Sequence, residues 1–357
     1  MAIIDDPSAF YQAALYTGND GTQAIVNGGN SDLQPDLVIM KTRNAGDLYR
    51  LYDSVRGANI GLVPNATDLE QNIANDGLTV FGSDGFTVVD GSNFGGGNYN
   101  QGSTNYVAWQ WKAGTSFSND QSSTSVGTID SAGSVNTDAG FSIITFTGTG
   151  SAGSVAHGLG VIPKLFVVKS RSNANGWIVY HGSLGAGKAI SWNLTDAAFA
   201  TGSRWNSTEP TSAVFTLGSA ADVNRSSGTH VCYAFAEKQG YSHFGSYTGN
   251  ANADGPFIYT GFKPAFFIYK SSTTAGEEWK ILDSKRDPIN RGSQRNLNVH
   301  TNTSESDDAN SIGEFVSNGV KIRSAHNNIN KSGDKFIYLA FAENPLVTSK
   351  GIPATAR

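Results

Sequence analysis

A carboxylate and a guanidinium stand three residues apart at two places in this sequence, Asp53 with Arg56 and Asp283 with Arg286. At this spacing the two side chains can pair across a turn through a charge-assisted hydrogen bond. A third segment of similar pattern has His181 and Leu184 instead, so the fold does not require the pair. An anion-binding site is the functional alternative, and we favour the structural pair. On an exposed surface such a pair would contribute little stability.

The other reactive side chains form no catalytic or metal-binding motif. The six histidines are scattered without ligand spacing, and the chain has no phosphate-binding loop, nucleophile elbow or paired cysteines. The single cysteine, Cys232, lies in a strand-like run that predicts a buried, inert thiol. We therefore expect no enzyme activity, no metal and no cofactor. Glycosidase carboxylates are paired in space rather than in sequence, so a polysaccharide depolymerase stays as a weaker alternative.

Two loops carry an aromatic residue beside asparagine, Trp205 with Asn206 and Tyr99 with Asn98. An exposed ring of this kind can stack on a sugar, and an adjacent amide can bind its hydroxyl groups. These four residues are the predicted glycan contacts. Local packing of the loops is the simpler interpretation of the same residues.

One pattern occurs three times along the chain. An aromatic-Thr-Gly triplet is followed by a proline that begins an apolar run ending in lysine, at Lys41, Lys169 and Lys270. An aromatic-rich segment then closes each copy after roughly 90 residues, a length typical of a whole domain rather than a solenoid repeat. The lysines are expected to be solvated charges at strand ends or donors of salt bridges between subunits.

The closing segments alternate large apolar residues with small or polar ones. Such alternation places the large side chains on one face of a strand. We interpret them as core residues of each copy, in preference to an aromatic platform for a ligand. The core positions predicted in this way are Trp109, Trp111, Tyr233, Phe235, Leu339 and Phe341.

Short alternating runs separated by Gly, Asn and Ser predict an all-β protein with minimal helix. The expected architecture is three tandem antiparallel β-sandwich repeats of jelly-roll-like form. Residues 115–140, mostly Ser, Thr, Gly, Asn and Asp, indicate a linker or a loose hairpin. The predicted boundaries are 1–114 for module one, 115–140 for the linker, 141–240 for module two, 241–350 for module three and 351–357 for a C-terminal tail.

The charge and the apolar patterns of the chain argue against two classes of partner, nucleic acids and membranes. The formal net charge is −5 and no basic block stands out, so we expect no nucleic-acid binding. No apolar stretch reaches membrane-spanning length, and the first residues lack the pattern of a signal peptide, so we expect synthesis in a cytoplasm and no membrane partner.

Several segments resemble a repeated domain found in structural proteins of tailed phages of marine and aquatic bacteria. The resemblance rests on Phe141 to Gly148, His157-Gly158-Leu159, Tyr241 to Asn250, Ile281 to Arg286 and Ala340 to Pro345. It covers nearly the whole chain, and the family itself has no assigned chemistry. Similar proteins are tail-fibre or virion-associated proteins, often as the distal part of longer chains, whereas this chain is nearly all repeat.

The resemblance implies a non-enzymatic structural protein on the virion surface, either a capsid decoration, a tail knob or a fibre component. Its expected partners are other virion proteins and further copies of itself, with a trimer favoured. The alternative is a receptor-binding protein that recognises a host surface polysaccharide through the loops around Tyr99 and Trp205.

Overall fold

The structure is a computed structural model that describes residues 3–91 and 99–344. It is all-β, as predicted, and built from antiparallel sheets. The helices of the described residues are single short turns. They are η1 (Pro7–Ala9), α1 (Gln121–Thr124), α2 (Gly202–Trp205), α3 (Ala221–Asn224) and α4 (Asn327–Asn330).

Three large sheets form most of the molecule, and we name them sheets I, II and III in chain order. Sheet I has the order β1 (Tyr11–Thr17), β9 (Asn105–Trp111), β3 (Leu37–Thr42), β4 (Arg50–Asp53), β5 (Ile60–Leu62), β6 (Gln71–Asn72). Sheet II has the order β10 (Thr115–Asn119), β11 (Ser131–Asn136), β12 (Phe141–Thr147), β19 (Thr229–Phe235), β14 (Leu165–Ser170), β15 (Trp177–His181), β16 (Lys188–Ser191), β17 (Phe199–Ala200). Sheet III has the order β20 (Ser242–Thr248), β28 (Lys335–Phe341), β22 (Phe266–Ser271), β23 (Lys280–Asp283), β24 (Gln294–Asn298), β25 (Ser306–Asp308).

A small sheet covers the outer face of each large sheet. The small sheets are β2 (Thr22–Val26) with β8 (Gly85–Val89) and β7 (Gly77–Gly82), then β13 (Gly153–Ala156) with β18 (Val214–Leu217), then β21 (Phe257–Tyr259) with β27 (Gly319–Ile322) and β26 (Gly313–Val316). Each layer pair encloses its own apolar cluster. Ala108 of β9 packs in one cluster with Phe86 of β8, and Cys232 of β19 packs in another with Phe215 of β18.

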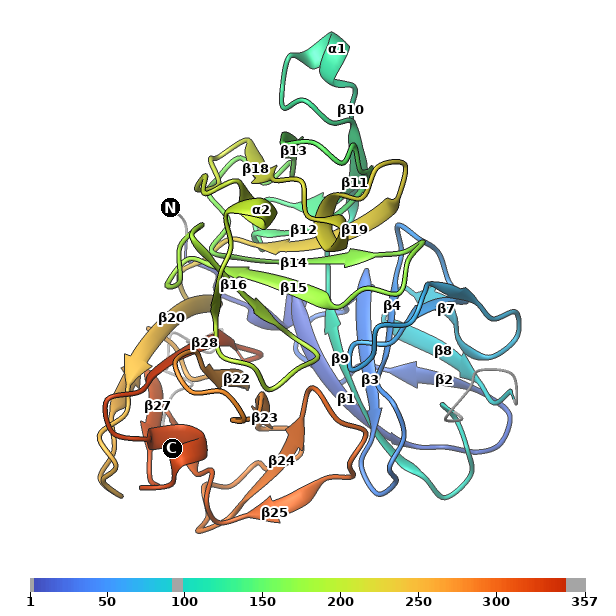
Figure 1. Cartoon of the computed structure of the whole chain (residues 1–357). Helices are drawn as coiled ribbons and strands as arrows, with labels where there is room; N and C mark the ends of the chain where they lie inside the picture. The colour runs from blue at the N-terminus through green and yellow to red at the C-terminus, as the bar shows by residue number, and fades with distance from the viewer. Residues whose placement is uncertain (1–2, 92–98, 345–357) are drawn as a thin grey trace.

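The inner faces of the three large sheets meet in one common core. The last residues of the closing strands β9, β19 and β28 are Trp111, Phe235 and Phe341, and their rings contact one another at centroid distances of 5.6 to 6.4 Å. In Figure 1 the blue, green and orange-red sheets surround this centre. The closing strands are therefore buried on both faces. The expectation that their large residues hold each module separately is wrong, because those residues join the three sheets.

Of the two forms predicted for residues 115–140, a linker and a loose hairpin, the structure shows the hairpin. Residues 115–140 contain β10, α1 and β11, and β11 pairs along β12 from Ser131 opposite Phe146 to Asn136 opposite Phe141. The segment is thus a hairpin that widens sheet II, and its tip around α1 projects from one end of the molecule (Figure 1). A small residue suits β11 at its contact with β12, since a Cβ at Gly133 would lie 1.8 Å from the carbonyl oxygen of Ile143.

Candidate functional site

The predicted glycan-stacking rings are buried. Trp205 is fully buried, and its indole N–H donates to the carbonyl of Lys188 at 3.1 Å. Tyr99 is also fully buried; its hydroxyl donates to the carbonyl of Leu48 at 2.9 Å, and the guanidinium of Arg50 lies over its ring. Asn206 is exposed at the end of α2, and Asn98 lies outside the described residues. The prediction is therefore wrong for both rings, because each ring packs in an apolar cluster, Trp205 with Phe166 and Tyr99 with Tyr52.

The six predicted core residues are all buried, with exposed fractions from 1% for Trp109 to 9% for Phe235. All six belong to the common core of the three large sheets. Their prediction as core is confirmed, and it carries a consequence that the sequence pattern does not contain. Removing one of these side chains affects the contact between sheets as well as the interior of one sheet.

Both predicted Asp–Arg pairs form, and both are buried. The guanidinium Nε of Arg56 lies 2.6 Å from the carboxylate of Asp53, and that of Arg286 lies 2.5 Å from Asp283. All four side chains have an exposed fraction of 0%. Each carboxylate also accepts the backbone N–H of its arginine. Burial changes their importance, because a buried charge must be both paired and hydrogen-bonded.

These carboxylates face the neighbouring sheet. Asp53 of sheet I accepts a hydrogen bond from the Tyr233 hydroxyl of sheet II at 2.6 Å. Asp283 of sheet III accepts one from the Trp109 indole of sheet I at 3.2 Å. His181 of sheet II lies 3.1 Å from the carbonyl oxygen of Tyr338 in sheet III. The three contacts close a ring from sheet I to II, from II to III and from III to I.

Sheet II has a histidine, His181, where sheets I and III have an aspartate, and this difference has a physical explanation. Asp53, His181 and Asp283 occupy the same register, each opposite the first residue of the preceding strand. Where Tyr233 and Trp109 supply a donor, the equivalent residue of sheet III is Leu339, which has none. A carboxylate would lack a partner there, whereas the imidazole of His181 can donate to a backbone carbonyl instead.

The loss of the arginine follows from the same change. Burial lowers the pKa of His181 to about 4, so the imidazole is neutral at pH 7 and needs no counter-ion. Leu184 stands where the other two turns have arginine, and it packs against the common core. Sequence comparison of the three segments revealed the substitution but could not supply this reason.

The three recurring lysines are buried rather than solvated, which corrects their predicted role. Lys41 donates to the carbonyl of Asn302 at 3.2 Å, and Lys169 donates to that of Thr67 at 3.2 Å. Both contacts reach a loop of the neighbouring sheet. Lys270 donates to the Ser271 carbonyl at 2.7 Å. Burial lowers the pKa of all three lysines to about 8.

We call the line of contact between two large sheets a seam. Ion pairs extend the seam between sheets I and II, and the seam between sheets III and I, toward the surface. Glu70 of sheet I lies 3.1 Å from Arg56 and 2.7 Å from Arg171 of sheet II. Glu305 of sheet III lies in the same way between Arg286, at 3.2 Å, and Arg43 of sheet I, at 2.9 Å. At the seam between sheets II and III, the Ala198 N–H donates to the Ser272 carbonyl at 3.0 Å. Sequence reasoning missed both glutamates, because nothing in their local pattern indicates a partner so far along the chain.

An open groove lies where sheets II and III adjoin. It has a volume of about 630 Å³ and is lined by Val161, Ile162, Lys164, Ala236, Glu237, Gln239, Ser242, His243, Tyr259, Thr260 and Gly261. Tyr259 is 63% exposed. The alternation of Phe257, Ile258 and Tyr259 around a buried isoleucine was the available sequence signal for an outward-facing aromatic here.

Residues 3–91 and 99–344 were also compared with what metal binding, thiol chemistry and membrane insertion require. No group of three or more His, Cys, Asp or Glu side chains in these ranges could hold a metal ion. Cys232 is buried and its thiol pKa is raised by desolvation, which confirms the inert interpretation. In the same ranges, no helix has the length and apolar character needed to cross a membrane.

The fold and the seams define an all-β protein in which three large antiparallel sheets share one core. The chain belongs to the family described as a domain of unknown function, DUF7483, whose model matches residues 6–345. That match spans all three large sheets. A search of curated proteins finds no match to the chain.

Proposed function

We propose that the chain is built from three tandem β-sandwich modules, residues 1–114, 141–240 and 241–350, arranged around a pseudo-threefold axis. Three features support this. The strand order of sheet I recurs in sheet III and, beyond the β10–β11 hairpin, in sheet II. The closing strands have equivalent neighbours and register. The contacts through Asp53, His181 and Asp283 form a closed ring.

The function that this arrangement supports best is that of a non-enzymatic structural protein on the surface of a tailed-phage virion. The observation that carries the proposal is the use made of the buried charged side chains. The buried Asp–Arg pairs and lysines, the groups whose environment could have marked a catalytic site, hold one sheet to the next or to its own turns. The result is a compact unit suited to assembly and display, in line with the resemblance to phage structural proteins.

Exposed strand edges are the proposed means of assembly with other virion proteins or further copies. The edge of β12 is covered by β11 of the same chain. Among the described residues, β1 and β20, at the same place in their sheets, each have one partner strand, and an isolated bridge joins Ser242 of β20 to Lys238. Glu343 accepts the N–H of Ala13 on the free side of β1, and Glu237 accepts that of Phe244 on β20. Beyond these residues, the ends of β1 and β20 offer backbone groups to an added strand.

The proposal is tested by the composition of purified particles. Phage particles banded in a density gradient should contain this protein, and labelled antibody should locate it on the capsid or the tail in electron micrographs. The purified chain should have the mass of a trimer in solution by light scattering. Absence from intact particles would contradict the virion proposal, and a monomeric mass would contradict only the trimer.

A receptor-binding function is the second proposal, and the groove beside Tyr259 is the observation that favours it. An exposed aromatic ring next to free polar side chains is a common feature of ligand sites. Fluorescently labelled protein should then bind host cells, and it should lose this binding after the surface polysaccharide is removed chemically.

A further inference from the structure

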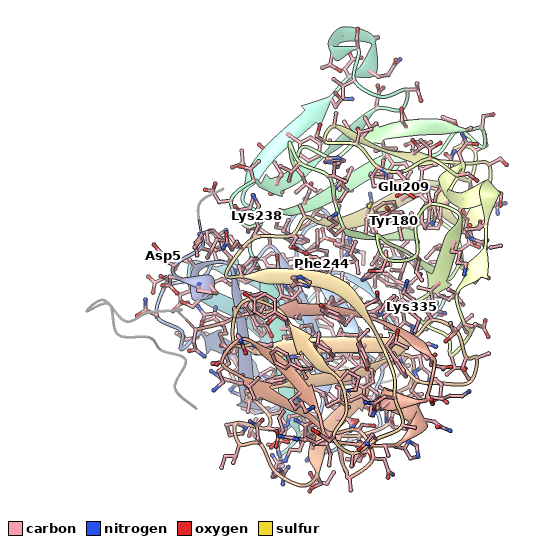
Figure 2. All side chains as sticks on the ribbon, turned by 90° about the vertical axis from the view of Figure 1, so that its left-hand side faces the viewer. Asp5, Tyr180, Glu209, Lys238, Phe244 and Lys335 are labelled. Atoms are coloured by element: carbon pink, nitrogen blue, oxygen red, sulfur yellow. The ribbon has the colours of Figure 1, made fainter. Side chains whose placement is uncertain are left out.

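The groove between sheets II and III is formed by three segments that are distant in sequence. Ile162 and Lys164 precede β14, Glu237 and Gln239 lie between β19 and β20, and Tyr259 ends β21. In Figure 2 the β20 ribbon crosses the foreground; Lys238 lies before the turn that leads into it, and Phe244 lies within the strand. The groove therefore exists only when the chain is folded.

One wall of the groove is apolar and exposed. Tyr259 is 63% exposed and Ile162 is 51% exposed, and both line the same hollow. The ring of Tyr259 extends over Gly261, where an added Cβ would lie 3.6 Å from the phenolic oxygen. Because Tyr259 is largely exposed, much of its ring is accessible to a ligand, at a position where core packing gives no reason for an aromatic residue.

The polar side chains of the groove include free donors. Within the described residues, the ammonium of Lys164 and the side-chain amide of Gln239 have no protein partner. The carboxylate of Glu237 lies 3.8 Å from the Nε2 of His243. His243 is itself held in place, because its Nδ1 lies 3.0 Å from the Tyr338 hydroxyl and its ring stacks on Tyr338.

We propose that this groove binds a hydroxyl-rich saccharide, with the sugar ring stacked on Tyr259. The inference rests on the receptor-binding proposal and names its site and ligand class. A sugar has an apolar C–H face that suits the tyrosine ring, and hydroxyl groups that both donate and accept hydrogen bonds. Glu237 supplies an acceptor, Lys164 supplies donors and Gln239 supplies both. The lining includes one ammonium, of Lys164, and one carboxylate, of Glu237, and this balance of charge favours a neutral sugar over a polyanion.

Calorimetric titration with a panel of neutral hexasaccharides, including cello-, malto- and manno-hexaose, tests the proposal. We expect at least one of them to bind, and Tyr259→Ala to weaken that binding by about tenfold or more, the equivalent of a lost aromatic contact. Tyr259→Phe should retain most of the affinity, because stacking requires the ring rather than the hydroxyl. Gln239→Ala should weaken binding to a smaller extent.

Phe257→Ala is the matched control. Phe257 lies two residues away on β21 and is 48% exposed, but it does not line the groove. Its replacement should leave the affinity unchanged, and circular dichroism should show that each variant is folded. Absence of binding by every hexasaccharide overturns the proposal, as does equal binding by the Tyr259→Ala variant. Host-cell binding that survives Tyr259→Ala would overturn this site while leaving the receptor-binding function intact.

Discussion

The buried carboxylates show how one residue can link two sheets. Asp53 binds Arg56 within its own turn and the Tyr233 hydroxyl of the next sheet. Arg56 in turn lies beside Glu70, which also binds Arg171. A charge in this position is stabilising only while the whole set of partners is present, since each member satisfies another.

Asp53→Asn is expected to destabilise the protein by about 3–5 kcal/mol, because it leaves the Arg56 guanidinium buried without its main counter-ion. Chemical denaturation measures the free energy of unfolding. Asp5 is exposed, and Asp5→Asn is the control, with an expected change within about 0.5 kcal/mol. Equal effects of the two substitutions would show that the buried pair contributes nothing specific.

His181 gives the protein a pH dependence of defined sign. Burial lowers its pKa to about 4 in the folded chain, below the value of about 6.5 for an unfolded chain. Between these values the unfolded state binds more protons, so the free energy of unfolding should fall as the pH is lowered from about 6.5 to about 4. His230, whose pKa is also lowered to about 4 by burial, adds to the same trend.

Unfolding free energies measured at several pH values should show this slope, and His181→Asn should reduce it. The asparagine amide can still donate a hydrogen bond but does not titrate. The part of the slope that comes from His230 should remain. A slope unchanged by His181→Asn would contradict the assignment of the titration to this residue.

At the scale of the elements, the decisive feature is that the closing strands are covered on both faces. Their small outward residues, such as Ala108 and Cys232, leave room for the small sheets, while the large residues fill the common core. β11 differs from the closing strands. It pairs through its backbone with β10 on one side and β12 on the other, and its Ser, Ala and Gly residues suit the close approach of its neighbours.

Gly133→Ala should detach β11 from β12, because the added Cβ would meet the carbonyl of Ile143 and the backbone has to move. Hydrogen exchange should become faster in residues 131–136 and stay slow in β14 and β19. Gly187→Ala, in the turn just before β16, is the control, since a Cβ there has no atom within 4 Å. Unchanged exchange in β11 would show that the hairpin tolerates the side chain.

At the scale of the whole molecule, the common core predicts that the sheets unfold together. Trp111, Phe235 and Phe341 contact one another, and each comes from a different sheet. Separation of any sheet would expose these rings to water and would remove the partners of the buried charges at its seams. Independent folding of one module is therefore disfavoured.

Scanning calorimetry should accordingly show one cooperative transition for the full chain. An isolated segment of residues 141–240 should bind a hydrophobic dye and lack a cooperative transition, because its inner face has no partner. Three separate transitions in the full chain, or a stable isolated segment, would contradict the common core as the main source of stability.

Local sequence patterns were enough to predict the strands, their alternation and the two Asp–Arg pairs. These features are local: a period of two decides which side chains share a face, and a spacing of three brings Asp53 and Arg56 across one turn. The repeated positions also identified Trp109, Tyr233 and Leu339 as core residues correctly. These patterns could not predict which sheet packs on a given strand face, because periodicity carries no information on the packing partner.

The burial of the loop aromatics and the contacts between sheets depend instead on how the sheets pack. Trp205 and Tyr99 lie in polar stretches of sequence but are buried, since each ring packs against a sheet whose position the local sequence does not encode. Tyr233 meets Asp53 across 180 positions of the chain, and this contact depends on how the sheets pack. The physical reason is that the common core orients the sheets, and their orientation creates both the charged seams and the groove beside Tyr259.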